Sequence, residues 1–142
     1  MISFTIPGKP KALKRHRVSR SGGMYDPSSE DKKDIILQIA QYRPKIPLTG
    51  DISLKLTFYM PRPKSHYRTG KRSHVLKAKA PVFHSIKPDL DNLVKLIADC
   101  LGNSTFIVDD SQICALASIK VYSDDLDWNN DHPRTEVIIE EI

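Results

Sequence analysis

Hydrophobic and polar residues alternate with a period of two in several parts of this chain. The longest alternation covers residues 51–60, DISLKLTFYM, and ends at Pro61 and Pro63. In a strand, this pattern places the apolar side chains on one face and the others on the opposite face. The segment therefore predicts a strand with one buried face, formed by Ile52, Leu54, Leu56, Phe58 and Met60.

Three other segments also have the pattern of a strand. Residues 2–6 alternate up to Pro7 and Gly8, which predict a turn. Residues 112–122 and 135–142 are rich in apolar and β-branched residues and predict two final strands. We expect the last of these strands to lie at an edge of the sheet.

Apolar residues recur at helical spacing in two segments. The first follows the cap sequence Ser28-Ser29 and stops before Pro44. The second covers about residues 89–102 and is closed by Gly102-Asn103. Its predicted core face consists of Leu90, Leu93, Val94, Ile97 and Leu101.

The predicted order is β-α-β-α-β-β, which is typical of an α+β fold. We expect a single domain over residues 1–142, with a small mixed or antiparallel sheet and two helices. Cys100 and Cys114 are expected to be free thiols in a reducing compartment. The chain has no run of about 18 apolar residues and no signal-peptide pattern, so we expect a cytoplasmic protein without membrane contact.

Charge is divided unevenly along the chain. Residues 1–88 carry 19 Lys and Arg against 5 Asp and Glu, whereas residues 89–142 carry 3 against 12. The first part therefore has a net charge of +14 and the second part −9. Such an excess of cations is typical of proteins that bind a polyanion such as nucleic acid. Solvated loops that only maintain solubility are the alternative.

Two tracts contain no acidic residue, Lys9 to Tyr25 and Pro61 to Pro88. Because solubility seldom requires such exclusion of acids, we expect both tracts to contact nucleic acid. Residues 61–86 also lack an apolar period, which predicts a flexible basic loop that touches the substrate. The expected DNA-binding residues are Lys9, Lys11, Lys14, Arg15, Arg17, Arg20, Lys64, Arg68, Lys71, Arg72, Lys77, Lys79 and Lys87.

Two aspartates and a lysine stand at the start of the second predicted helix. Asp89 lies in or just before the first turn, and Asp91 and Lys95 are one turn apart. Acids are favoured at a helix start, and Asp91 with Lys95 has the spacing of an ion pair. On these residues alone, helix capping is the better explanation.

A second acid pair, Asp109-Asp110, precedes the strand that begins near Ile113. Asp89, Asp91 and one aspartate of this pair could converge as three oxygen ligands, the type that Mg²⁺ or Mn²⁺ prefers. Lys95 would then contact a phosphate or the charge that develops on it. The spacing leaves capping and a metal site as about equal alternatives.

A joint motif runs through residues 87–103 and 106–122, KPDLDNLVKLIADCLGN and FIVDDSQICALASIKVY. It consists of D-x-D-N-x-x-K, an aspartate at the position of Asp99, and D-D-[SA]-Q-[VI]. In this motif the chain resembles the RusA family of Holliday-junction resolvases, which is common in phages and prophages. The segment GKPKALKRHRVSRSGGMYDPS is similar to the phage branch, so the resemblance spans most of the chain and is strongest over residues 87–122.

The resemblance implies a RusA-like homodimer, an Mg²⁺-dependent endonuclease that cuts four-way DNA junctions in recombination and repair, with Mn²⁺ as a possible substitute. By position, Asp89, Asp91 and Asp110 would be the metal-binding acids and Lys95 the catalytic lysine. Asn92, Asp99 and Asp109 match supporting positions. We expect Asp109 to support the strand end, and Asp99 to orient Lys95 or to contact a neighbouring subunit. The loop over residues 61–86 is longer than in the compact bacterial form, which leaves the substrate range open.

Two other functions remain as alternatives. The chain could be a non-catalytic protein that binds DNA or junctions, with its acids acting only as caps and ion pairs. It could also be a metal nuclease that acts on other branched DNA or on RNA. A lysine within the acid cluster favours catalysis, because a helix cap needs no such partner.

Overall fold

A four-stranded mixed sheet forms the centre of the computed structural model, which describes residues 1–123 and 132–142. The strand order is β1-β6-β4-β5, with β1 (Ile2–Pro7), β6 (Arg134–Glu141), β4 (Ile52–Met60) and β5 (Ile113–Tyr122). The pairs β1–β6 and β6–β4 are antiparallel, and β4–β5 is parallel. The last strand is therefore internal, and our expectation that it lies at an edge was wrong.

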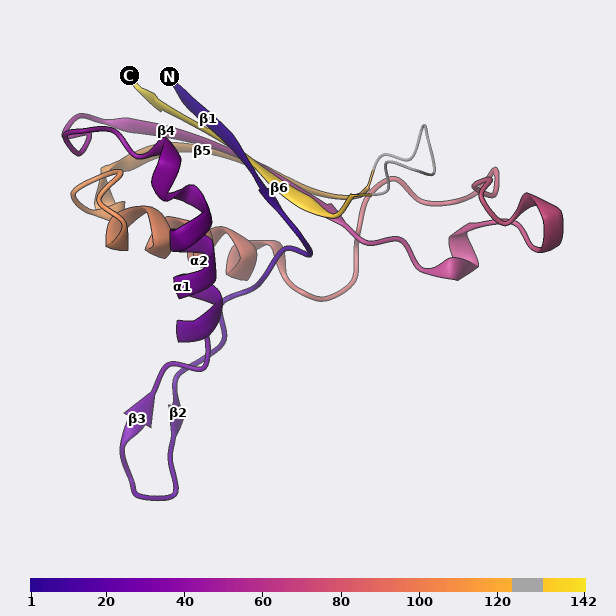
Figure 1. Ribbon diagram of the computed structural model, residues 1–142, viewed down its shortest axis with the longest axis horizontal. Coiled ribbons are helices and arrows are strands. Elements are labelled where there is room, and N and C mark those ends of the chain that lie inside the picture. The colour runs from indigo at the N-terminus through magenta and orange to yellow at the C-terminus, as the bar shows by residue number, and fades with distance from the viewer. Residues whose placement is uncertain (124–131) are drawn as a thin grey trace.

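Both long helices, α1 (Ser29–Ile39) and α2 (Leu90–Asn103), cover the same face of the sheet (Figure 1). The alternating residues of β4 point toward them, and Leu54, Leu56 and Phe58 are each 1% exposed. Burial of this apolar surface stabilises the two-layer packing. The predicted α+β class, with two helices and a mixed sheet in the expected order, is confirmed.

The start of α1 was predicted correctly, but Ser28 does not act as a side-chain cap. Its hydroxyl accepts a hydrogen bond from the backbone N–H of Lys14 at 2.8 Å, and its own N–H donates to Asp26 at 2.9 Å. Ser28 is fully buried. It therefore joins the basic N-terminal tract to the beginning of α1.

The buried face of α2 is broader than the predicted stripe. Leu93, Ile97 and Leu101 are buried as expected, but Leu96 and Cys100 are buried too. Because α1 packs beside α2, these two residues on the flank of the helix are also removed from water. Cys100 and Cys114 are free thiols, as predicted, and burial raises the pKa of Cys100 to about 12.

Two segments project from the body (Figure 1). A short hairpin of β2 (Arg17–Val18) and β3 (Met24–Tyr25), at the bottom of the view, was not predicted from the sequence. The basic loop, residues 61–86, extends to the right and contains the 3-10 turns η2 (Lys64–His66) and η3 (Gly70–Arg72). Two more such turns are η1 (Ala40–Tyr42) and η4 (Asp110–Gln112). Among the described residues, no helix is long and apolar enough to span a membrane.

Candidate active site

Asp89 and Asp91 are exposed at the N-terminal end of α2. Asp89 is the N-cap residue in an extended conformation, and its carbonyl oxygen accepts from the N–H of Leu93 at 3.3 Å. Its side chain makes no capping hydrogen bond. A carboxylate whose only purpose was to cap the helix would accept from the free N–H groups of the first turn. The carboxylate of Asp89 is thus available to a ligand.

Lys95 lies one turn after Asp91, and its ammonium nitrogen is 4.0 Å from the Asp91 carboxylate. The two side chains are 60% and 69% exposed, so the pair is long and well solvated. An ion pair of this kind contributes little to stability. Both groups can therefore turn toward a bound phosphate or cation at little cost.

Asn92 connects the acidic helix to the basic N-terminal tract. Its carbonyl oxygen accepts a hydrogen bond from the backbone N–H of Leu13 at 2.9 Å. This bond holds the segment between Lys9 and Arg15 alongside the first turn of α2. Cations and acids that are far apart in the sequence are thereby brought to the same region.

Lys120 of β5 contacts the chain next to the candidate site, and the sequence did not reveal this contact. Its ammonium group donates to the carbonyl oxygens of Ile86 at 2.6 Å and Pro88 at 2.5 Å. These carbonyls belong to the chain just before Asp89, so Lys120 fixes how the chain enters α2. The only sequence signal was a lysine in an otherwise uncharged strand of an acidic region.

Asp109 and Asp110 differ in their surroundings. The Asp109 carboxylate accepts from the N–H of Ser111 at 3.2 Å and from the Ser111 hydroxyl, and these bonds lower its pKa. Gln112 completes the turn by accepting from the N–H of Asp109 at 2.9 Å. Asp110 is exposed, and its carboxylate has no hydrogen-bond or ion-pair partner within the described part of the chain. Asp109 is therefore held in place as the N-cap of η4, whereas the carboxylate of Asp110, the first residue of η4, is available to a ligand.

The structure does not bring Asp110 together with Asp89 and Asp91 in one copy. Asp110 lies just before β5, and Asp89 lies beside the other end of that strand, where Lys120 binds Pro88. Helix α2 has 14 residues, which at about 1.5 Å per residue separates its two ends by roughly 20 Å (Figure 1). Residues 1–123 and 132–142 contain no group of three or more His, Cys, Asp or Glu that could hold a metal ion.

Asp99 pairs with Lys32 of α1, at 3.3 Å, rather than with Lys95. Lys32 also binds Asp26 at 2.8 Å, and its side chain is only 15% exposed. Burial lowers the pKa of Lys32, but its hydrogen bonds to Asp26 and Asp99 outweigh this effect and the pKa is raised. The triad connects the hairpin base, α1 and α2.

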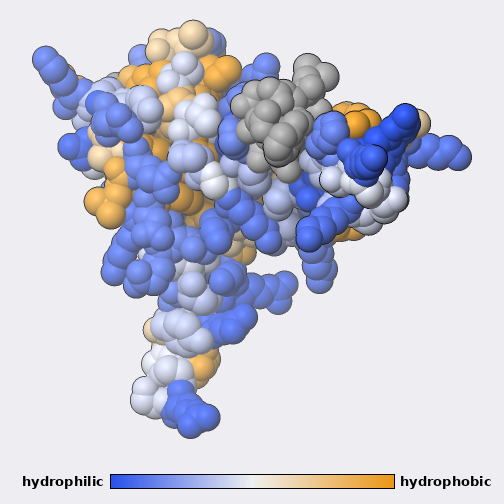
Figure 2. Space-filling model, turned by 45° about the vertical axis from the view of Figure 1, so that its right-hand side comes forward, coloured by the Kyte–Doolittle hydropathy of each residue, from blue (hydrophilic) through white to orange (hydrophobic). Residues whose placement is uncertain are grey.

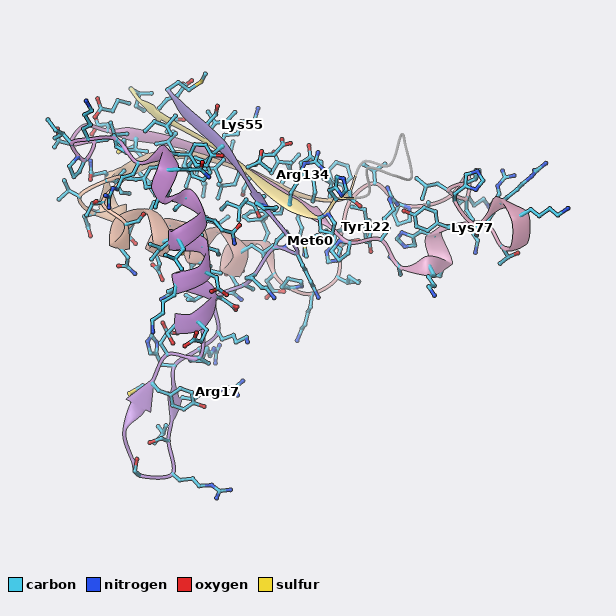
Figure 3. The ribbon with its side chains drawn as sticks, viewed as in Figure 1. Arg17, Lys55, Met60, Lys77, Tyr122 and Arg134 are labelled. Carbon is cyan, nitrogen blue, oxygen red and sulfur yellow. The ribbon has the colours of Figure 1, made fainter. Side chains whose placement is uncertain are left out.

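The thirteen expected DNA-binding residues are all exposed. Those of the first tract lie before and within the hairpin, and those of the second lie along the basic loop, with Lys87 near Asp89. Figure 2 shows strongly hydrophilic residues on both projections, beside some pale and hydrophobic ones, and Figure 3 shows Arg17 and Lys77 on separate projections. The cations thus form two outlying groups around the body.

Arg62 anchors the basic loop to the sheet. Its guanidinium donates to the carbonyl oxygens of Ser123 at 3.1 Å and Pro81 at 2.8 Å, and it lies 5.2 Å from the ring centroid of Tyr122. The rings of His66 and His84 also pack against Tyr122, and their ring centroids lie 4.6 and 4.8 Å from that of Tyr122. This cluster stands where β4 and β5 end, close to Met60 (Figure 3). The loop therefore leaves the body from a fixed base.

Comparison with known proteins gives two matches. A family model described as "Endodeoxyribonuclease RusA" matches residues 7–140. A protein of Bacillus subtilis (strain 168), described as "Uncharacterized protein YqaN", is 36% identical over 146 residues, which cover 99% of this chain and 96% of that protein. Both matches extend over nearly the whole chain.

Proposed function

The chain belongs to the RusA family of endodeoxyribonucleases, and on that premise we propose that it resolves Holliday junctions by paired, symmetrical cleavage in DNA recombination and repair. The observation that carries this proposal is the exposed pair of carboxylates at the N-terminal end of α2. Asp89 and Asp91 expose carboxylates that do not cap the helix, with Lys95 within 4.0 Å of Asp91. The absence of a capping hydrogen bond from the Asp89 side chain supports a ligand-binding role for it over simple capping.

The available acids have the donor chemistry that Mg²⁺ prefers. The carboxylates of Asp89, Asp91 and Asp110 are exposed and offer hard oxygen ligands. Asp89 and Asp91 would hold Mg²⁺ or Mn²⁺ together with an Asp110 from the second copy of the proposed homodimer, because one copy keeps Asp110 away from them. The ion would supply an activated water and stabilise the leaving oxygen in phosphodiester hydrolysis. Because these acids would otherwise repel DNA, their pairing with a cation also permits the substrate to approach.

In this proposal, Lys95 would bind the phosphate that is cut. Its ammonium group is mostly solvated and is held only loosely by Asp91. When a phosphate approaches, Lys95 can donate hydrogen bonds to it, and this interaction grows stronger as negative charge develops in the transition state. Asp91 limits where the ammonium group can move.

The two basic projections would bind the arms of the junction. Their exposed Lys and Arg side chains suit the phosphate backbone, which gives affinity without reading the base sequence. The hydrogen bond from Leu13 to Asn92 places one of these groups next to the proposed catalytic acids. DNA held by the projections would therefore pass by α2.

The decisive experiment compares wild type and Asp91→Asn on a synthetic four-way junction, with and without Mg²⁺. We expect the variant to bind the junction but not to cut it. Asp34→Asn, a change of an exposed acid on α1, is the matched control and should cut like wild type. Equal cutting by wild type and Asp91→Asn would contradict the site assignment.

One observation favours a second function, that of a non-catalytic junction-binding protein. The candidate metal ligands lie at opposite ends of α2 in a single copy. Junction binding by wild type without any Mg²⁺-dependent cutting would support this alternative. If the protein instead cut other branched DNA or RNA in preference to the four-way junction, the proposed substrate would be wrong but the nuclease function would stand.

A further inference from the structure

We propose that the hairpin of β2 and β3 is a wedge that places Val18 and Met24 against the base pairs at the branch point of a DNA junction. This inference rests on the proposed function and deepens it, because it assigns the selection of branched DNA over linear duplex to two apolar side chains. The cations around them would add affinity for any DNA backbone, without that selection.

The first argument is the exposure of an apolar pair. Val18 is 65% exposed and Met24 is 71% exposed. The two residues lie opposite each other in the register of the hairpin, so their side chains share one face of the ribbon. Among the described residues, the hydrophobic core and the side chains packed against it include neither of them. Apolar side chains that are grouped in water in this way mark a contact surface.

The second argument is the charge around this pair. Residues 9–25 contain no acid, and Arg17 and Arg20 are exposed on the hairpin itself. Figure 2 shows hydrophobic residues beside hydrophilic ones on the lower projection. Proteins that insert apolar side chains between bases combine these two features, because their cations bind the phosphates while the apolar groups contact the base faces. The surface of the hairpin therefore suits DNA whose bases can be reached.

The hairpin is narrow at its tip. Residues 19–23 are Ser-Arg-Ser-Gly-Gly, so the turn carries one long side chain. The N–H of Ser19 donates to the carbonyl oxygen of Gly23 at 2.7 Å, and Gly22 takes a φ of +87°, which glycine adopts without strain. The major groove of DNA, about 12 Å wide, admits a two-stranded ribbon, whereas the minor groove is only about 6 Å wide. The hairpin would therefore reach the bases from the major-groove side.

Both strands of the hairpin are attached where they leave the body. Before β2, the N–H of Leu13 donates to the carbonyl oxygen of Asn92 in α2 at 2.9 Å. After β3, the carboxylate of Asp26 pairs with Lys32 of α1 at 2.8 Å. The hairpin thus projects from a fixed base beside the first turn of α2 (Figure 1). DNA that is held at the wedge would lie next to the proposed catalytic acids.

Stacking explains why a wedge would select a branched molecule. In a linear duplex each base pair is stacked on both neighbours, so an inserted side chain must first separate two of them at a cost in free energy. At the branch point of an open junction, the flanking base pairs lack a stacked neighbour on one side. Val18 and Met24 can cover these faces and leave water without that cost. The wedge would therefore add affinity for the junction and little for the duplex.

The preference for a four-way junction over a linear duplex tests the wedge. Both affinities are measured by fluorescence anisotropy without Mg²⁺, so that metal-dependent cutting does not interfere. The double variant Val18→Ser/Met24→Ser should bind duplex like wild type, whereas its preference for the junction should fall about tenfold, as expected for the lost burial of two apolar side chains. The matched control is Leu37→Ser/Ile46→Ser, in which both replaced residues are 76% exposed. An unchanged preference in the first variant, or an equal fall in the control, would overturn the proposal.

A second measurement locates the hairpin on the DNA. On a Cys114→Ser background, Met24→Cys is labelled with a photoreactive maleimide, and the buried Cys100 stays unlabelled. Cross-links should form at the nucleotides that flank the branch point, and Leu37→Cys should give none there. Cross-links spread along the arms, or none, would contradict the wedge. Capture of wild type but not of the double variant by phosphatidylserine vesicles, with an unchanged junction preference, would assign the hairpin to a membrane surface instead.

Failure of the wedge and failure of the proposed function can be told apart. If wild type cuts no nucleic acid but Met24→Cys marks the branch point, the nuclease function fails and the wedge stands. If wild type cuts junctions with Mg²⁺ but the double variant keeps the full junction preference, the wedge is wrong and the nuclease function stands.

Discussion

Lys120 on β5 donates a hydrogen bond to the carbonyl oxygen of Pro88, the residue immediately before Asp89. A second bond from the same ammonium group, to Ile86, is 2.6 Å long. A strand on the sheet thus holds the chain at the point where the acidic helix begins. We therefore expect Lys120 to position Asp89.

Replacement of Lys120 by methionine should leave the protein folded but weaken metal-dependent cutting. The loss of a group that orients a metal ligand typically reduces metal affinity or activity by about 10- to 100-fold. The measurement is the cutting rate as a function of Mg²⁺ concentration, in which Lys120→Met should need more Mg²⁺ for half-maximal rate. Lys55→Met, a change of an exposed lysine on β4, is the control. An unchanged Mg²⁺ dependence of Lys120→Met would exclude the positioning role.

Replacement of Lys32 by methionine should destabilise the fold. It leaves Asp26 and Asp99 without their shared partner, and hydrogen bonds to charged groups contribute about 1.5–3 kcal/mol each. Because the side chain is mostly buried, we expect the free energy of unfolding in urea to fall by about 3 kcal/mol. Lys33→Met, on the exposed side of α1, should change it much less. Similar losses in both variants would show that the triad adds nothing specific.

The contribution of Asp26 to stability should depend on pH. Its hydrogen bond from Lys32, and then that from the Ser28 N–H, lower its pKa below the ordinary value of 3.8. Since the folded pKa is below the unfolded one, the stabilisation is present above pH 3.8 and is lost as the pH falls through the folded pKa. Asp26→Asn should therefore be less stable than wild type at neutral pH, and the difference should shrink in acid. Urea unfolding of both proteins at a series of pH values measures this difference in stability. A difference that does not change with pH would contradict the role of the ionised Asp26 carboxylate.

The basic loop should contribute to the salt dependence of junction binding. Each phosphate contact changes the slope of log affinity against log salt by about 0.9. Replacing Lys71 and Arg72 by glutamine should therefore flatten the slope by about two if both contact phosphates. Lys33 and Lys55, changed together to glutamine, give a control with the same change in net charge. Equal slopes for the two double variants would mean that η3 does not touch the backbone.

Much of the fold is encoded in local patterns. Alternation along residues 51–60 predicted β4, and the acids and Pro88 ahead of an apolar stripe predicted the start of α2. The place of β6 between β1 and β4 depends on pairings across the whole chain, which no local pattern records. The hairpin was missed because Val18 and Met24 are both exposed and show no apolar period.

The candidate site was only partly readable from the sequence. The joint motif led to the family, which the match over residues 7–140 shows. Proximity in the motif suggested that the acids meet, but the helix between them keeps them apart in one copy. Lys120 and Arg62 donate hydrogen bonds to backbone carbonyl oxygens. Every residue has such a carbonyl, so the sequence does not indicate which one a side chain will bind.

The attachment of Arg62 would also let the basic loop work as a tethered arm. Its guanidinium donates to the carbonyl oxygens of Pro81 and Ser123, so the residues between Pro63 and Pro81 can move without pulling on the sheet. Motion of this arm along DNA would therefore leave Asp89 and Asp91 where they are. The same body could in that way hold DNA arms that meet at different angles.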